Sequence, residues 1–120
     1  MDYTRMLPFM DEEELKKVAF MILDGEITNV RLEALFPFVG RETLSEITTK
    51  LIEQKDSERL RHVIPFIGKT KVLELYEAIQ DGNIEGIDLE DLLPFLGSEK
   101  IKELFYKSIK ASKEDTPTEE

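Results

Sequence analysis

Oxygen-bearing side chains are concentrated between Asp81 and Leu92, at a spacing that partly matches a calcium-binding loop. With Asp81 at loop position 1, Asn83 and Glu85 fall on ligand positions 3 and 5, and Gly86 falls on position 6, where such loops turn sharply. Position 12 of such a loop supplies a bidentate Glu, but this chain has Leu92 there. The segment therefore predicts a turn followed by a helix N-cap, and weak cation binding is the alternative.

His62 is the only histidine of the chain and its most obvious candidate for acid–base chemistry. It lies between Arg61 and Val63, and the chain has no cysteine and no second histidine with which it could share a metal ion. An acid–base role needs a pocket and a partner group, and the sequence identifies neither. The serines lie in no nucleophile motif, and no Gly-rich phosphate loop is present. We therefore expect no catalytic residue, no metal site and no cofactor.

The balance of charge disfavours two classes of partner. Asp and Glu number 26 against 16 Lys and Arg, so the formal net charge is −10. Proteins that bind nucleic acids or anionic membranes draw affinity from Lys and Arg, so we expect neither partner. The longest apolar run, Val18 to Leu23, is far shorter than the ~20 residues that span a bilayer. The N-terminal segment lacks the basic-then-apolar order of a signal peptide, and we expect a cytoplasmic protein.

The dipeptide Pro-Phe recurs at a nearly constant interval. Its prolines are Pro8, Pro37, Pro65 and Pro94, so the period is 28 or 29 residues. A period of about 20–50 residues is typical of repeat proteins, in which each unit buries its apolar face only by stacking on its neighbours. We favour a structural role for Pro-Phe, in which Pro ends one helix and Phe fills the layer between helices. A binding role would require all four Phe rings to be exposed.

An apolar stripe follows each Pro-Phe in the same register. When each proline is counted as position zero, positions 7, 10, 11 and 14 are mostly apolar, and this spacing places them on one side of an α-helix. Position 7 holds Leu15, Leu44, Val72 and Ile101; position 10 holds Val18, Ile47, Leu75 and Leu104; position 11 holds Ala19, Thr48, Tyr76 and Phe105. The stripe predicts a helix of about four turns as the first helix of every unit.

Capping residues indicate where these helices begin and end. Position 3 is Asp11 in the first unit and Gly in the others, and it is either the N-cap of the first helix or, where it is Gly, the residue that closes the helix before it. The first helix should end near Asp24-Gly25 in unit one and Asp81-Gly82 in unit three, since Gly tolerates a left-handed conformation. A shorter second helix should follow and end against the next Pro-Phe. Its expected N-caps are Thr28 or Asn29 in unit one, Ser57 in unit two and Asp88 in unit three.

These patterns predict an all-α fold built from tandem αα-hairpin repeats of ~29 residues. We expect four units, the last one incomplete, stacked as a short α-superhelix or as a compact helical bundle. Residues 1–111 should form a single helical-repeat domain. Residues 112–120 contain no apolar side chain, so we expect a disordered acidic tail there.

The first unit departs from the pattern at positions 12 and 13. These positions are polar or small in the middle units but are Phe20 and Met21 in unit one, so residues 18–23 are apolar on all sides. A helix of this kind is normally buried on more than one side, by the second helix, by the N-terminal arm or by another molecule. With Tyr106 as the counterpart at the other end of the array, we predict a protein interface or self-association interface at Phe20, Met21 and Tyr106.

Charge is also segregated along the chain. Residues 59–71 contain four basic side chains and no acid, whereas residues 74–99 contain eight acids and no base. Either neighbouring units neutralise one another or the acidic face docks a basic partner. We predict a small non-catalytic helical-repeat protein that acts as a protein–protein interaction or adaptor module. The alternatives are a regulatory domain that binds a ligand or cation between helices and, least favoured, an enzyme.

Overall fold

The computed structural model of the chain describes residues 2–115, with side chains described through Lys110. No strand occurs in these residues, so the prediction of an all-α fold is confirmed. The α-helices are α1 (Glu12–Leu23), α2 (Arg41–Gln54), α3 (Ser57–Gln80) and α4 (Ser98–Asp115). The short 3-10 helices are η1 (Tyr3–Arg5), η2 (Leu7–Phe9), η3 (Leu32–Leu35) and η4 (Leu89–Phe95). None of these described helices combines the length and the apolar character that crossing a membrane requires.

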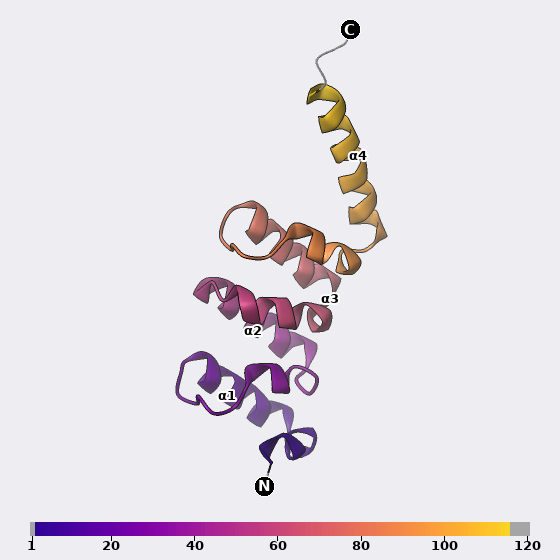
Figure 1. Ribbon diagram of the computed structural model, residues 1–120. Coiled ribbons are helices and arrows are strands. Elements are labelled where there is room, and N and C mark those ends of the chain that lie inside the picture. Colours follow the sequence, from indigo (N-terminus) through magenta and orange to yellow (C-terminus); the bar gives the residue numbers. More distant parts are fainter. Residues whose placement is uncertain (1, 116–120) are drawn as a thin grey trace.

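The helices follow one another along the long axis of an elongated molecule (Figure 1). The principal extents are 70 × 25 × 20 Å and the radius of gyration is 18.1 Å, whereas a compact domain of this length has a radius of gyration of about 14 Å. The described helices therefore form an elongated molecule, to whose length the protruding α4 contributes. At one end α4 rises away from the stack (Figure 1), and it continues past Ala111 to Asp115. Residues 112–115 of the predicted tail are thus helical, and residues 116–120 lie outside the described part of the chain.

Aspartate side chains begin two of the α-helices. The Asp11 carboxylate accepts a hydrogen bond from the N–H of Glu14 at 3.0 Å, as the predicted N-cap of α1 should. The prediction that Ser57 caps α3 is wrong, because the preceding residue, Asp56, makes the capping bond at 3.2 Å. Lys55, directly before it, adopts a left-handed conformation with φ 58° and so ends α2 sharply.

The second helix predicted in each unit is α-helical only in unit two, where it forms the first part of α3. In units one and three it is one of the 3-10 helices, η3 or η4. The prediction that Thr28 or Asn29 begins this helix is wrong, because the N-cap of η3 is Arg31. The loop after α1 extends to Arg31, and η3 spans only Leu32–Leu35. The prediction that each second helix ends against Pro-Phe is wrong for units two and three, because Pro65 lies inside α3 and Pro94 lies inside η4. Asp88 is confirmed as the N-cap of η4 and accepts from the N–H of Glu90 at 3.2 Å.

Gly68 interrupts α3, which is therefore two helical segments joined at a kink. Its φ of 83° and ψ of 164° are not helical, and Pro65 lies three residues earlier. Gly97, before α4, has a similar φ of 87°, whereas Gly40 has φ −73° and is a conventional N-cap of α2. The glycine at position 3 is therefore the N-cap of the next helix in one unit, at Gly40, and the residue that ends the preceding helical segment in another, at Gly68.

A side chain from the first residues of each long helical segment lies over the glycine that precedes the next segment. The three pairs are Glu12 over Gly40, Arg41 over Gly68 and Lys69 over Gly97. A Cβ atom on Gly97 would lie 2.6 Å from Cδ of Lys69, and one on Gly68 would collide with the Arg41 guanidinium. Close approach and positive φ together explain why glycine occupies these two positions.

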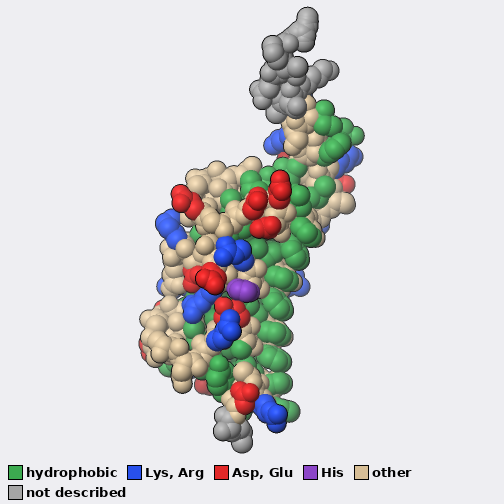
Figure 2. All heavy atoms as spheres, in the orientation of Figure 1, with side chains coloured by type: hydrophobic (Ala, Val, Ile, Leu, Met, Phe, Trp, Pro, Cys, Tyr) green, Lys and Arg blue, Asp and Glu red, His purple; other side chains and the backbone are tan. Residues whose placement is uncertain are grey.

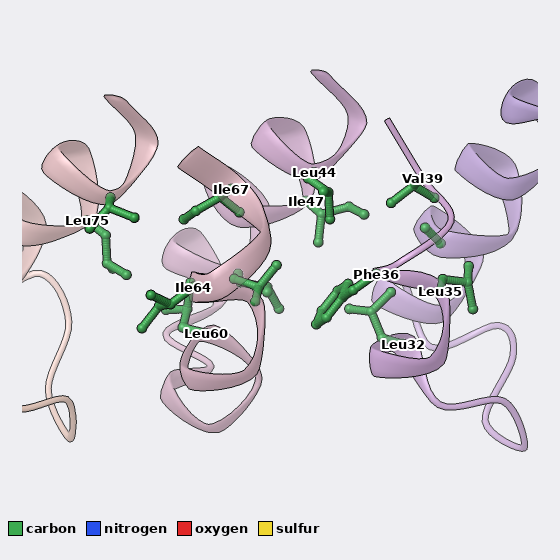
Figure 3. Close-up of a cluster of buried hydrophobic side chains, with 14 of the residues drawn as sticks. Leu32, Leu35, Phe36, Val39, Leu44, Ile47, Leu60, Ile64, Ile67 and Leu75 are labelled. Atoms are coloured by element: carbon green, nitrogen blue, oxygen red, sulfur yellow. The ribbon is translucent and has the colours of Figure 1, made fainter. Parts of the chain in front are cut away.

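The core is a band of aliphatic side chains that runs along the stack between two layers of helices (Figure 3). The long helices contribute the predicted stripe, with Leu15, Ala19, Ile22, Leu44, Ile47, Leu51, Val72 and Leu75 all buried. The short elements contribute Leu32, Leu35, Phe36, Leu60, Val63, Ile64 and Leu92. The 3-10 helix η3 packs on α1 and α3, η4 packs on α3, and α2 packs on α3. In the first three units, the short element that follows each long helix thus packs against it.

Candidate protein-interaction surface

The C-terminal helix α4 presents an apolar face that no described element covers. Phe105, Tyr106 and Ile109 are 58%, 61% and 48% exposed, and the two rings stand edge to face with centroids 5.5 Å apart. The residues at the register position of Phe105 in the earlier helices are at most 5% exposed: Ala19, Thr48 and Tyr76. The stripe position that is buried in α1, α2 and α3 is therefore open at Phe105 of α4.

The base of α4 is anchored to the stack, while the rest of the helix extends from it. Ile101 and Leu104 are partly buried against the core. The ammonium group of Lys100 lies 5.3 Å from the centre of the Tyr76 ring, within the range of a cation–π interaction. These contacts hold the first two turns of α4 and leave the turns that carry Phe105 and Ile109 exposed.

Leu93, just before α4, extends the exposed apolar face onto the stack. It is 40% exposed, whereas Phe36 and Ile64, which occupy the same place before the two preceding Pro-Phe pairs, are buried. Leu93, Ile101, Phe105 and Tyr106 line one hollow of about 660 Å³. Figure 2 shows hydrophobic side chains in a band along one edge of the stack and up onto α4. The hollow at Leu93 and the exposed face of α4 together form what we call the α4 face.

The opposite end of the molecule also exposes apolar side chains. Met6 is 45% and Phe9 is 88% exposed, whereas Leu7 between them is buried. This N-terminal segment is held by Asp2, whose carboxylate accepts a hydrogen bond from the N–H of Thr4 at 3.0 Å. Hydrogen bonds from the Thr4 side chain and backbone lower the pKa of Asp2 below its ordinary value.

The structure does not bring the predicted interface residues together. Phe20 and Met21 lie on α1 and are half-buried, and Phe20 lines a shallow hollow with Glu46 and Lys50 of α2. Tyr106 belongs to the α4 face, at the other end of the stack (Figure 1). Of the three predicted residues, only Tyr106 lies on a strongly exposed apolar surface.

Sequence reasoning missed most of the residues at the two exposed ends: Met6, Phe9, Leu93, Phe105 and Ile109. One signal was present in the sequence. Tyr3, Met6 and Leu7 precede the first Pro-Phe at the same spacing as Leu32, Leu35 and Phe36 precede the second. The N-terminal arm therefore has the pattern of a short second helix, and η1 and η2 occupy its place in the structure.

The Pro-Phe pairs do not form a uniform row of exposed rings. All four prolines are exposed, but Phe66 and Phe95 are only partly exposed and pack against the core. The Phe66 ring lies 5.9 Å from the ring of Phe36, centroid to centroid. Phe9 and Phe38 are exposed, so only two of the four rings meet the condition for a binding role.

Two positively charged side chains hold the loop between Asp81 and Leu92 through its backbone carbonyls. The ammonium of Lys55 donates to the carbonyl of Asn83 at 2.9 Å, and the guanidinium of Arg61 donates to the carbonyl of Gly86 at 2.6 Å. No group of three or more Asp, Glu or His side chains within the described residues could hold a metal ion. His62 lies exposed on the same helical segment as Arg61. The arrangement favours a structural turn over a cation site.

A second hollow, of about 530 Å³, lies beside the kink at Gly68 and is lined by Arg41, Lys69 and Lys71 among other residues. Lys71 is buried, and its ammonium is engaged by the Glu74 carboxylate at 2.8 Å and by the Thr49 hydroxyl at 2.7 Å. At this point the basic segment of the chain neutralises the start of the acidic one.

Comparisons of this chain with models of protein families, with curated proteins and with solved structures find no match.

Proposed function

We propose that this chain is a non-catalytic helical-repeat module that binds a protein partner through the α4 face. In this proposal it consists of four helical units of ~29 residues, the last one incomplete, and the short second helix is α-helical in unit two and 3-10 in units one and three. Two observations support the repeat. The stripe is buried in the same register in α1, α2 and α3, and the contact between a helix start and the next glycine recurs three times at the same positions.

The observation that carries the proposed function is the contrast at position 11. Phe105 is exposed, although Ala19, Thr48 and Tyr76 are buried under the elements that pack on α1, α2 and α3. Covering these partly exposed apolar side chains would remove apolar surface from water, which favours association. Exposed apolar surface of this kind can mark a protein interaction site. The α4 face is thus equipped to receive an amphipathic element from a partner.

The shape of the molecule supports a binding role for this end. Helices in proteins depend mostly on packing for their stability, and their own propensity contributes little. The part of α4 that leaves the stack has little packing of this kind. The second half of α4 therefore gains order when a partner covers Phe105 and Ile109. The groups available for catalysis give no comparable support, because His62 is exposed and lies apart from the α4 face on α3.

Site-specific photo-crosslinking tests this function. A photoreactive phenylalanine analogue is placed at position 105, with a matched control at Lys107, which is exposed on the other side of α4. In cells that express the chain, the analogue at position 105 should give one or a few discrete protein adducts, and the analogue at 107 should give several-fold less. Equal, diffuse labelling at both positions would contradict a binding role for the α4 face.

A further inference from the structure

We propose that a second copy of this chain covers the α4 face, and that it does so with its N-terminal segment, residues 2–10. This inference rests on the proposed function and names the partner. It predicts a head-to-tail assembly in which the start of one copy completes the last unit of another. Figure 1 places the N-terminal segment and α4 at opposite ends of the long axis, so this contact joins copies end to end.

The N-terminal segment has the pattern and the local structure of the elements that cover the long helices. Tyr3, Met6 and Leu7 precede Pro-Phe at the spacing found in η3 and η4, and the segment forms the 3-10 helices η1 and η2. Its exposed residue Met6 stands at a position that is fully buried in the three other short elements: Leu35, Val63 and Leu92. In those elements this side chain belongs to the core shared with the long helices. Met6 is therefore one exposed side of the proposed interface. The other side, at Phe105 and Tyr106 of α4, is also exposed.

Leu93 and Phe9 give a second, independent match. Within the chain, Phe36 stands directly before one Pro-Phe and contacts Phe66 of the next, with ring centroids 5.9 Å apart. Leu93 stands directly before the fourth Pro-Phe and is exposed, whereas Phe36 is buried. In the proposed assembly, Phe9 of the second copy packs on Leu93 of the first. This contact is the counterpart of the one between Phe66 and Phe36 within a single copy. Phe9 is the most exposed large hydrophobic residue of the described chain, so this contact covers both exposed ends at once.

The charges of the two ends are complementary in sign. Residues 98–110 of α4 carry four lysines and two glutamates, and residues 11–17 at the start of α1 carry four acids and two lysines. The proposed contact places these segments in neighbouring layers, as α1 and α2 are placed within one copy. Opposite net charges favour this encounter over the pairing of two like ends.

The contact is heterologous, because each copy uses two different surfaces. Such a contact produces rings if the rotation closes and open chains of copies if it does not. A symmetric dimer through two α4 faces is the competing arrangement, and it would leave Met6 and Phe9 without a role.

Two exposed-site variants distinguish these arrangements. Met6→Glu blocks the N-terminal end and Phe105→Glu blocks the α4 face, while Lys107→Arg, which keeps the charge on the other side of α4, serves as the control. Sedimentation velocity of the full chain over a concentration series should show mass rising with concentration for the unmodified chain and for the control. Each blocked variant alone should associate at least tenfold more weakly. An equimolar mixture of the two blocked variants should form a dimer and nothing larger, because one intact end of each kind remains. Circular dichroism verifies that every variant keeps its helical content.

A mixture that does not associate, or a Met6→Glu variant that dimerises as well as the unmodified chain, would overturn the head-to-tail contact. An unmodified chain that stays monomeric over the whole series would also overturn it. The proposed function fails separately, if the crosslinker at position 105 gives no discrete adduct of any kind. Adducts to a different protein would retain the proposed function and refute self-assembly.

Discussion

The carboxylate of Glu12 accepts the backbone N–H of Gly40 with both oxygens, at 3.0 and 2.9 Å. The Thr43 hydroxyl donates to the same carboxylate at 2.8 Å. Glu12 begins α1 and Gly40 precedes α2, so the first turn of one helix supplies the N-terminal cap of the next. A negative charge at a helix N-terminus is favoured by the helix dipole, and this contact fixes the register of the first two layers of the stack.

Glu12→Ala should lower the free energy of unfolding by about 1 kcal/mol, the usual effect of removing an N-terminal capping group. The loss should follow because Gly40 N–H and the Thr43 hydroxyl both lose their acceptor. Glu13→Ala is the matched control, since Glu13 is an exposed carboxylate in the same turn of α1. Urea denaturation followed by circular dichroism measures both variants, and equal effects of the two substitutions would contradict a capping role for Glu12.

Gly68→Ala should destabilise the fold by more than Gly25→Ala does. Both glycines have a φ of 83°, but Gly68 combines it with a ψ of 164°, a region that is essentially restricted to glycine. Gly25 is the residue that closes α1, where the N–H of Glu26 donates to the Met21 carbonyl at 2.9 Å, and an L-residue in a left-handed conformation there costs roughly 1–2 kcal/mol. A Cβ on Gly68 would also displace the end of the flexible Arg41 side chain, whereas a Cβ on Gly25 meets no atom within 4 Å. The double variant Gly68→Ala with Arg41→Ala should therefore recover only a small part of the loss. Thermal or urea unfolding measures the three variants, and equal losses for Gly68→Ala and Gly25→Ala would contradict this account of the kink.

Calcium titration should leave the loop between Asp81 and Leu92 unaffected. The carbonyls of Asn83 and Gly86 accept hydrogen bonds from Lys55 and Arg61, and these positive charges beside the loop oppose a bound cation there. Amide chemical shifts recorded during the titration should show no saturable change confined to this loop. A saturable shift there, lost in an Asp81→Asn variant, would instead support the cation-binding alternative.

The sequence predicted the long helices well because their signals are local. Asp11 caps α1 through a bond within one turn, and the stripe that includes Leu44 and Val72 reports directly which side of each helix is buried. The short elements were predicted less well. The sequence does not separate Ser57 from Asp56 as the cap of α3, because both are good capping residues, and no local pattern distinguishes the 3-10 helix η3 from a short α-helix.

The candidate site could not be predicted from local patterns, because it depends on which elements lie next to each stripe. Phe105 has the same register as Tyr76 and the same apolar character, and only the three-dimensional arrangement shows that one is open and the other is buried. Phe20 stood out in the sequence because its neighbours are apolar on all sides. The structure places it beside α2, where it is half-buried, whereas the strongly exposed apolar residues lie at the two ends.

Amide hydrogen exchange, measured residue by residue in dilute solution, tests most directly the claim that the α4 face is uncovered in the free chain. Exchange protection reports how much free energy is needed to open each segment. Amides of residues 105–110 should exchange at least a hundredfold faster than those of residues 72–76 in α3, and covering the face with a partner should slow them. Equal protection of α4 and α3 in the dilute, monomeric chain would contradict the account.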